Sequence, residues 1–187
     1  MAGDFKKTCE EFNASARGLP RSGKTTDIML TRYALLLKHK AETDEEKTAL
    51  VATLYDCGIE MLKYYTGPNG STYIRDSAPT NIETIFSTLR RPESLKYIPE
   101  KSAAELADIA LELLTKADTA DDAKFHSNNQ YEGYIRTMIN FSRTALQTAD
   151  ACRAALDDRE IDIKTGKSIT PVKRIVLKTP EDTGGPK

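Results

Sequence analysis

The sequence lacks tryptophan, long apolar runs and any large excess of charge, and each absence narrows what the chain can be. Among its 187 residues, 27 are Lys or Arg and 28 are Asp or Glu, so the formal net charge is -1. A near-neutral chain has no global field to draw it onto DNA, RNA or an anionic membrane. No apolar stretch approaches the roughly 20 residues of a membrane span, and Met1 to Lys7 lack the apolar core of a signal peptide. We expect no membrane partner and a cytoplasmic location, or a virion location if the protein is viral.

Cysteine and histidine are also scarce, which excludes several kinds of site. The three cysteines, Cys9, Cys57 and Cys152, are widely spaced and form no Cys-x-x-Cys pair. The sequence therefore predicts neither a disulfide framework nor a zinc site. Asp122 lies four residues before His126 and would share its helix face, but no second pair of metal ligands accompanies them. We predict no metal and no cofactor.

Recognisable catalytic arrangements are missing as well. The sequence contains no Gly-x-Ser-x-Gly, no evident Cys and His nucleophile pair, and no carboxylates placed as in a glycosidase. The acidic clusters at 44–46 and 121–122 stand at predicted helix starts, where carboxylates favour the positive end of the helix dipole. We predict that the protein is not an enzyme.

Helical patterns account for most of the chain. Apolar residues recur at helical spacing over about 27–40, 43–66, 80–91 and 102–118. Three capping-box patterns predict where helices start: Thr43–Glu46, Thr80–Glu83 and Ser102–Glu105. We predict an all-α fold, a helical bundle of about five helices.

Two segments of the helical region carry more specific local predictions. On the first predicted helix the apolar face consists of Met29, Tyr33, Leu36 and Leu37. Between the second and third helices, residues 66–79 predict a loop or a short hairpin in which Tyr73 and Ile74 would be extended.

The last helical pattern is the longest and runs from about 121 to 158. Its apolar positions keep alternating spacings of four and three for nearly four heptads, as in a coiled-coil seam. The seam residues are Tyr131, Ile135, Met138, Ser142, Ala145, Ala149, Cys152 and Leu156. The small side chains in its C-terminal half predict close approach of another helix or of a partner chain.

The two ends of the chain differ from the helical middle. We predict a flexible N-terminal arm over 1–26, with one helical turn near Phe5 to Phe12, and a helical domain over 27–158. Residues 159–187 predict an extended arm and tail, since β-branched residues replace the helical period and Thr165-Gly166-Lys167 is typical of a hairpin turn. A lone hairpin is marginally stable in water, so this short β arm should lie on the helices or pair with a neighbour.

One nucleotide-binding motif is matched to the letter. Gly18-Leu19-Pro20-Arg21-Ser22-Gly23-Lys24-Thr25 fits the P-loop pattern, in which Gly18, Gly23, Lys24 and Thr25 would hold phosphate. A P-loop must follow a buried parallel strand, whereas residues 10–17 are polar. We therefore favour a basic, glycine-containing arm that leads into a helix, and keep P-loop nucleotide binding as a less favoured alternative.

The favoured hypothesis is a non-catalytic helical protein that works by assembly or interaction, such as a structural or scaffold subunit of a virus or phage particle or of a larger complex. Its partner would be a second copy of the chain or another protein. The interface candidates are Tyr131, Ile135, Met138, Ala145, Ala149, Cys152, Leu156, Val172, Ile175 and Leu177.

An alternative function uses the basic residues of the two arms. These are Arg17, Arg21 and Lys24 near one end, and Lys164, Lys167, Lys173, Arg174 and Lys178 near the other. If folding brought them together, the protein would be a nucleic-acid-binding or regulatory helical domain.

Overall fold

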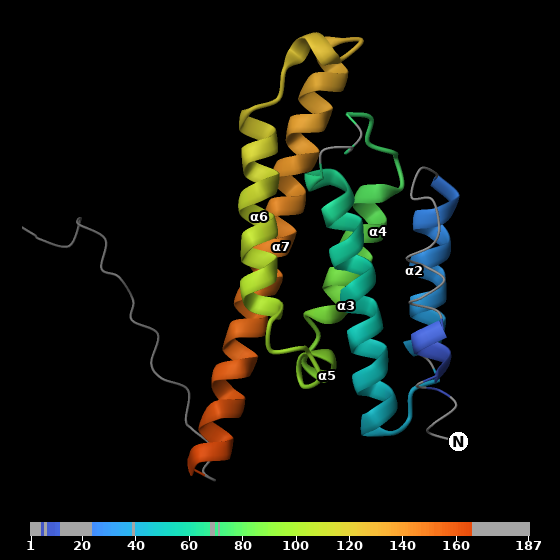
Figure 1. The fold of residues 1–187 in the computed structure, drawn as a ribbon, viewed down its shortest axis with the longest axis vertical. Helices are drawn as coiled ribbons and strands as arrows, with labels where there is room; N and C mark the ends of the chain where they lie inside the picture. Colours follow the sequence, from blue (N-terminus) through green and yellow to red (C-terminus); the bar gives the residue numbers. More distant parts are fainter. Residues whose placement is uncertain are drawn as a thin grey trace, which may run out of the picture. The chain divides into compact units, whose positions relative to one another are not determined.

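The structure, a computed structural model, contains helices and loops and no strand in the residues that it describes. These are Phe5 and residues 7–11, 24–38, 40–67, 70 and 72–165, with side chains described for 5, 7–11, 30–38, 40–67, 70 and 72–158. The helices are α2 (Lys24–Lys38), α3 (Asp44–Thr66), α4 (Ala78–Leu89), α5 (Pro92–Leu95), α6 (Ser102–Asp118) and α7 (Asn128–Thr165), with a 3₁₀ turn η1 at Asp122–Lys124 (Figure 1). The predicted all-α fold with a long C-terminal helix is confirmed.

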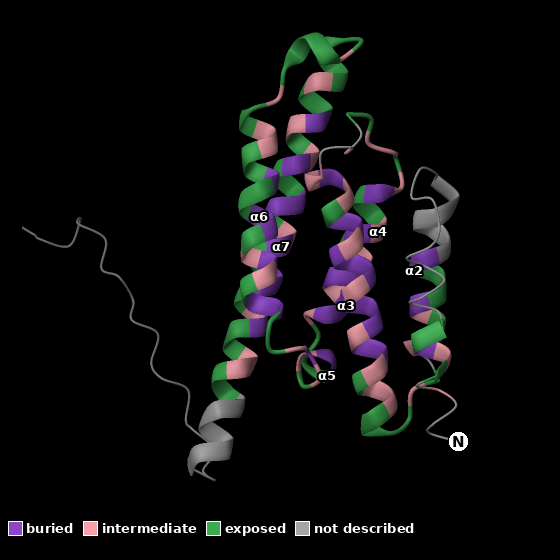
Figure 2. Ribbon diagram, in the orientation of Figure 1, coloured by how far each residue is buried: buried purple, intermediate pink, exposed green. Residues whose placement is uncertain are grey.

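Helix α3 is the centre of the bundle. It packs against α2, α4 and α6, and Figure 2 shows buried residues on it along most of its length. Its buried residues are Leu50, Val51, Thr53, Leu54, Tyr55, Cys57, Gly58, Ile59, Met61, Leu62 and Tyr65. A helix that is apolar nearly all round must be surrounded by other elements. The single apolar face predicted for this segment is therefore only part of what α3 buries.

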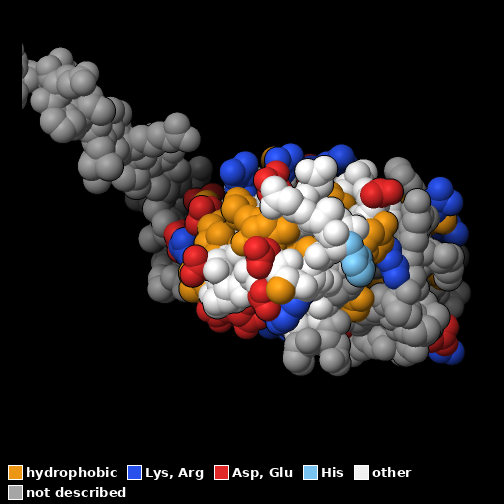
Figure 3. Space-filling view, turned by 90° about the horizontal axis from the view of Figure 1, so that it is seen from above, with side chains coloured by type: hydrophobic (Ala, Val, Ile, Leu, Met, Phe, Trp, Pro, Cys, Tyr) orange, Lys and Arg blue, Asp and Glu red, His pale blue; other side chains and the backbone are white. Residues whose placement is uncertain are grey.

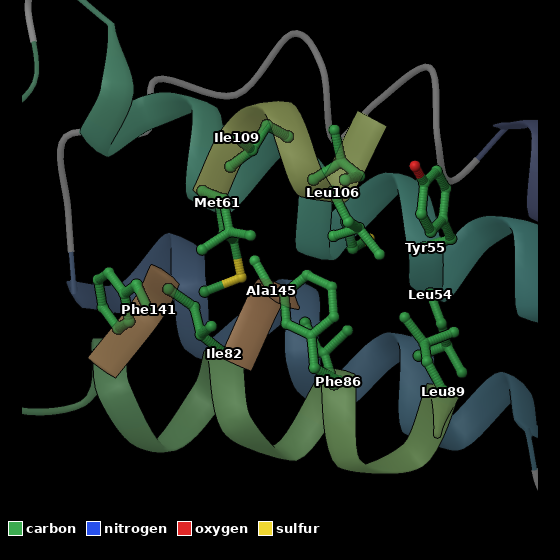
Figure 4. Close-up of a cluster of buried hydrophobic side chains, with 14 of the residues drawn as sticks. Leu54, Tyr55, Met61, Ile82, Phe86, Leu89, Leu106, Ile109, Phe141 and Ala145 are labelled. Atoms are coloured by element: carbon green, nitrogen blue, oxygen red, sulfur yellow. The ribbon is translucent and has the colours of Figure 1, made fainter. Parts of the chain in front are cut away.

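Side chains from four helices meet in one core. Figure 4 shows Leu54 and Met61 of α3 near Phe86 of α4, together with side chains of α6 and α7. Leu54 and Phe86 are completely buried. Burial of a side chain of this size stabilises the fold by about 1.5–3 kcal/mol, so this cluster holds together segments that lie far apart in the sequence.

The capping box at the start of α3 is confirmed. The backbone N–H of Glu46 donates to Oγ1 of Thr43 at 3.2 Å, and the backbone N–H of Thr43 donates to Oε2 of Glu46 at 3.1 Å. Hydrogen bonds from the backbone of Glu42 and of Thr43 lower the pKa of the Glu46 carboxyl. The helix start was therefore correctly predicted from local sequence.

The other two predicted capping boxes are wrong. Helix α4 begins earlier, at Ala78, with Pro79 in its first turn, and neither α4 nor α6 has a side-chain cap hydrogen bond. The carboxylates assigned to the two boxes make other contacts instead, each including a bond to a neighbouring helix. Glu83 contacts Arg90 and Thr144, and Glu105 accepts hydrogen bonds from α3.

The buried face of α2 agrees with the prediction at Leu37 and differs from it at Tyr33 and Leu36. The buried apolar residues are Leu30, Ala34 and Leu37, whereas Tyr33 is 41% and Leu36 is 60% exposed. The side chain of Met29 lies outside the described residues. Because α2 carries apolar residues on more than one face, its packing against α3 and α4 decided which of them became core.

The ends of the helical region differ from their predicted positions. The helical turn predicted near Phe5 to Phe12 is confirmed, because Phe5 and residues 7–11 are helical. Cys9 is buried in the core, so this part of the predicted flexible arm packs on the bundle. Burial raises the pKa of the Cys9 thiol. Helix α2 begins at Lys24 rather than near Asp27.

Helix α7 is displaced at both ends. It begins at Asn128 rather than near 121, because η1 and a turn precede it, and it continues to Thr165 rather than ending near 158. Residues 159–165 are therefore helical and not extended. Contacts divide the chain into residues 1–156 and 157–187. The predicted hairpin turn from Gly166 onward and the β arm lie outside the described residues.

The segments on either side of α4 contain bends, turns and one short helix. Residues 72–77 form bends and a turn, so Tyr73 and Ile74 are not in a strand. Between α4 and α6, the one-turn helix α5 begins at Pro92, which is a favourable residue in a first helical turn.

One carboxylate fixes α6 against α3. Oε2 of Glu105 accepts a hydrogen bond from the Tyr55 hydroxyl at 2.7 Å, and Oε1 accepts from Nζ of Lys63 at 2.8 Å. Burial alone would raise the pKa of Glu105, but the bonds from Lys63 and Tyr55 outweigh it and the pKa is lowered. Burial and the bond to Glu105 raise the pKa of Tyr55, so this phenol stays protonated and remains a donor.

We predict that Glu105→Ala lowers the free energy of unfolding by about 1–3 kcal/mol, because the buried Tyr55 hydroxyl loses its acceptor. The lowered pKa of Glu105 means that its bonds stabilise the protein above the pKa of the unfolded chain, and that this stability is lost as pH falls through the folded pKa. Urea unfolding at several pH values should show the difference from wild type shrinking on acidification. Glu100→Ala, at an exposed position, is the control, and an equal loss in both variants would contradict the assigned role.

Two helical glycines provide a matched pair for testing the packing. A Cβ on Gly58 would lie 2.9 Å from Cζ of the buried Phe86, whereas a Cβ on Gly133 would meet nothing within 4 Å. Alanine in a helix interior is favoured over glycine by about 1 kcal/mol, while overpacking a core costs about 1–3 kcal/mol. Gly133→Ala should therefore raise the urea midpoint and Gly58→Ala should lower it. The same direction of change in both would show that Phe86 can move aside or that position 133 is crowded.

Candidate interaction surface

The heptad seam of α7 faces the protein's own core. Met138, Ala145 and Cys152 are completely buried, and Ala149 is 1% exposed. Ser142 donates a hydrogen bond from Oγ to the backbone carbonyl of Ala110 on α6, at 2.9 Å. The predicted close approach of another helix is therefore made within the chain, and these seam residues are covered by it.

The remaining interface candidates have different positions. Tyr131, Ile135 and Leu156 are partly buried at the two ends of the seam. Val172, Ile175 and Leu177 lie outside the described residues. Because the middle of the seam is occupied, a partner chain in this conformation would have to contact another face of α7.

Polar contacts hold α7 against α4 on the side of the seam away from α6. Oε2 of Glu83 accepts a hydrogen bond from the Thr144 hydroxyl at 2.9 Å. Arg90 donates to Oγ1 of Thr148 at 3.2 Å and forms an ion pair with Glu83. Together with the bond from Ser142 to α6, these contacts determine which side of α7 remains exposed.

An apolar stripe runs along the exposed side of α6 and α7. It consists of Leu111, Leu114, Ile139 and Leu146, which are 62%, 40%, 38% and 40% exposed. The two helices lie side by side and run in opposite directions (Figure 1). By the register of the Ser142–Ala110 bond, Leu111 and Leu114 of α6 lie at about the level of Ile139 of α7, and Leu146 lies farther along α7 toward its C-terminal end. Single exposed apolar residues are common, whereas a group on adjacent helices marks a candidate contact surface.

Charged residues border the apolar stripe with opposite signs on its two sides. Successive residues of a helix are about 100° apart around its axis. On α6, Asp108 and Glu112 therefore lie beside Leu111 on the side away from α7. On α7, Arg136 and Arg143 lie beside Ile139 on the side away from α6. All four are exposed. We call Asp108 and Glu112 the acidic row and Arg136 and Arg143 the basic row.

A groove continues the stripe toward the η1 end. It has a volume of about 630 Å³, and its lining includes Ala117 and Asp118 of α6 and Ile135, Arg136 and Ile139 of α7. Figure 3, seen from that end, shows apolar side chains exposed among acidic and basic ones. The groove extends the surface that a bound helix could contact.

Sequence reasoning missed this stripe because it assigned each helix a single apolar face. Leu111 and Leu114 are separated by three residues, and Ile139 and Leu146 by seven, so each pair repeats at helical spacing. A search for a second apolar face on the last two helices would have found all four residues. It could not have shown that the two pairs are adjacent.

The other predicted sites are only partly within the described residues. Gly18 and Gly23 of the P-loop match lie outside them, Lys24 and Thr25 begin α2, and the described segments supply no strand to precede such a loop. Most of the basic arm residues also lie outside the described part of the chain, with the backbone of Lys164 in α7.

Metal-binding and membrane-spanning features can be assessed for the described part of the chain. Within it, no group of three or more His, Cys, Asp or Glu residues could hold a metal ion. Its three cysteines are buried and are not joined by a disulfide bond. None of its helices is long and apolar enough to cross a membrane.

The chain matches no protein-family model, no curated protein and no solved structure. What the protein does must therefore be inferred from the geometry and chemistry of its own surface.

Proposed function

We propose that the protein is a non-catalytic assembly subunit that binds a second copy of itself through the outer face of α6 and α7. The observation that carries this proposal is the apolar stripe, Leu111, Leu114, Ile139 and Leu146, in which four large aliphatic side chains remain substantially exposed. Covering a Leu or Ile side chain removes apolar area from water and favours association by about 25 cal/mol per Å². The heptad seam no longer supports the proposal, because the chain's own helices cover it.

The charges beside the stripe favour a second copy over an unrelated partner. A two-fold axis parallel to the helices would place α6 of one copy against α7 of the other. The acidic row, Asp108 and Glu112, would then face the partner's basic row, and the apolar stripes would meet between them. A two-fold axis perpendicular to the helices would place acidic row against acidic row, which is repulsive. The surface is therefore complementary to itself in one orientation.

The register within the chain predicts which charges would meet. Because Ser142 lies opposite Ala110 in antiparallel helices, Asp108 lies at about the level of Arg143. In the proposed dimer each Asp108 would lie close to Arg143 of the partner subunit, and there would be two such pairs by symmetry. The apolar centre is small by comparison with stable interfaces of about 1,600 Å², so the dimer should dissociate on dilution.

Sedimentation equilibrium of the full-length chain over a concentration series tests the proposal. We expect a monomer–dimer equilibrium in the wild type and a monomer in the double variant Leu111→Ser and Ile139→Ser, because the centre of the interface becomes polar. Leu36→Ser, at a 60% exposed leucine on α2, should leave the equilibrium unchanged. A wild type that is monomeric at every concentration would exclude self-association.

A charge exchange tests the orientation. Arg143→Glu should weaken the dimer, because it places like charges beside the partner's Asp108, and adding Asp108→Arg to the same chain should restore much of the association. Both changes are on exposed positions, and Arg32→Glu on α2 serves as the control. Equal weakening by the single and double variants would show that these two residues do not face each other across the interface.

A further inference from the structure

A second cavity lies at the η1 end of the bundle, among residues that the proposed dimer does not use. Its volume is about 440 Å³, within the usual range for small-molecule pockets. Three segments line it: the loop before α4, the loop between η1 and α7, and the first turns of α7. The residues that matter for its chemistry are Ile74, Arg75, Lys124, Phe125, Gly133 and Tyr134.

The pocket carries two cations without carboxylate partners. Arg75 and Lys124 both line it, and neither forms an ion pair with a described carboxylate. Nη1 of Arg75 is buried and has no hydrogen-bond partner among the described residues. Leaving a buried charged donor unpaired is unfavourable by more than the roughly 1–3 kcal/mol of a neutral group. A rotation of the guanidinium toward the cavity would let an acceptor on a ligand reach Nη1 and remove that penalty.

Charge in the pocket favours an anion but limits its size. Asp76 also lines the cavity, so the fixed charges of Arg75, Lys124 and Asp76 sum to a single positive charge. His126 adds a further polar group to the same wall. A ligand with one carboxylate or phosphate group matches this balance better than a polyanion does.

A glycine on α7 lines the pocket. Gly133 lies in α7, where glycine is less favourable than alanine by about 1 kcal/mol. A Cβ built on it would meet nothing within 4 Å, so neither close packing nor a neighbouring backbone requires the missing side chain. Gly133 is itself one of the residues that line the cavity.

Aromatic rings form the apolar wall. The Phe125 ring packs against Tyr134 at 5.2 Å between ring centroids and against Tyr131 at 5.4 Å. Tyr134 is 7% exposed, and burial raises the pKa of its hydroxyl. Ile74 lines the cavity from the opposite loop. Rings held in this way present a fixed apolar surface to a ligand.

We propose that this pocket binds a small organic anion. Arg75 and Lys124 would hold its carboxylate or phosphate group, and its apolar body would lie against Phe125 and Tyr134 in the space left by Gly133. The site is independent of self-association, because it shares no residue with the apolar stripe or with the acidic and basic rows.

Phenyl phosphate is a suitable probe, because it joins an anionic group to an aromatic ring. Titration into the ¹⁵N-labelled full-length protein should shift the amide signals of Gly133 and Tyr134. Its affinity should exceed that of inorganic phosphate by about tenfold, which corresponds to about 1.4 kcal/mol. Phenol alone should bind more weakly than phenyl phosphate. Absence of shifts at these amides with all three compounds at millimolar concentrations would overturn the proposal.

Two variants locate the binding. Arg75→Gln should weaken phenyl phosphate binding at least about tenfold, and Arg32→Gln should not change it. Gly133→Leu should abolish binding by filling the cavity while leaving the free energy of unfolding equal to that of wild type or higher. Wild-type affinity in both Arg75→Gln and Gly133→Leu would show that the anion binds elsewhere and would also overturn the proposal.

Discussion

Small side chains let α7 pack closely against its neighbours, and the exposed surfaces of the protein depend on that approach. Ala145 and Ala149 are buried in the core, and Ser142 lies near enough to α6 to bond the Ala110 carbonyl. A larger residue at these positions would separate the helices, because protein interiors are packed without voids. The same contact sets the antiparallel register. It therefore decides which residues of α6 and α7 become neighbours on the outer face.

Polar bridges between helices complete this arrangement. Glu105 joins α6 to α3 through Tyr55 and Lys63, and Glu83 and Arg90 join α4 to α7. Each bridge includes a carboxylate that the local sequence assigned to a capping box. A helix can start without a side-chain cap because water or other groups satisfy its first amides. A buried phenol such as Tyr55 needs a hydrogen-bond acceptor, so Glu105 bonds Tyr55 rather than the first turn of its own helix.

The two proposed sites are places where local rules of stability are not followed. The apolar stripe leaves large aliphatic side chains in water, and Gly133 leaves a helix interior without a side chain beside an open cavity. Arg75 keeps a buried donor unpaired. Such departures are expected where binding requires them. They concern different partners, a second copy of the chain in one case and a small anion in the other.

Local sequence determined the elements of this protein. Helical periodicity placed α3, α4, α6 and α7, and the Thr43–Glu46 box marked the start of α3, because hydrogen bonds within a helix and its first turn depend only on nearby residues. The heptad seam of α7 was also correctly recognised as a surface that another helix would cover. The helix boundaries at Asn128 and Thr165 were less predictable, since the transition from helix to loop depends on weak preferences.

Only the tertiary structure decided which partner covers each face. The sequence of α2 offered Tyr33, Leu36 and Leu37 as core, but packing against α3 and α4 buried Leu37 together with Leu30 and Ala34. The sequence of α7 was compatible with a seam facing another chain, yet the chain's own helices cover it. Each half of the apolar stripe repeats at helical spacing in its own helix, but no single segment shows that the two halves are adjacent or that three separate segments form the pocket. Both arise from residues distant in sequence, whose proximity is set by how the helices pack.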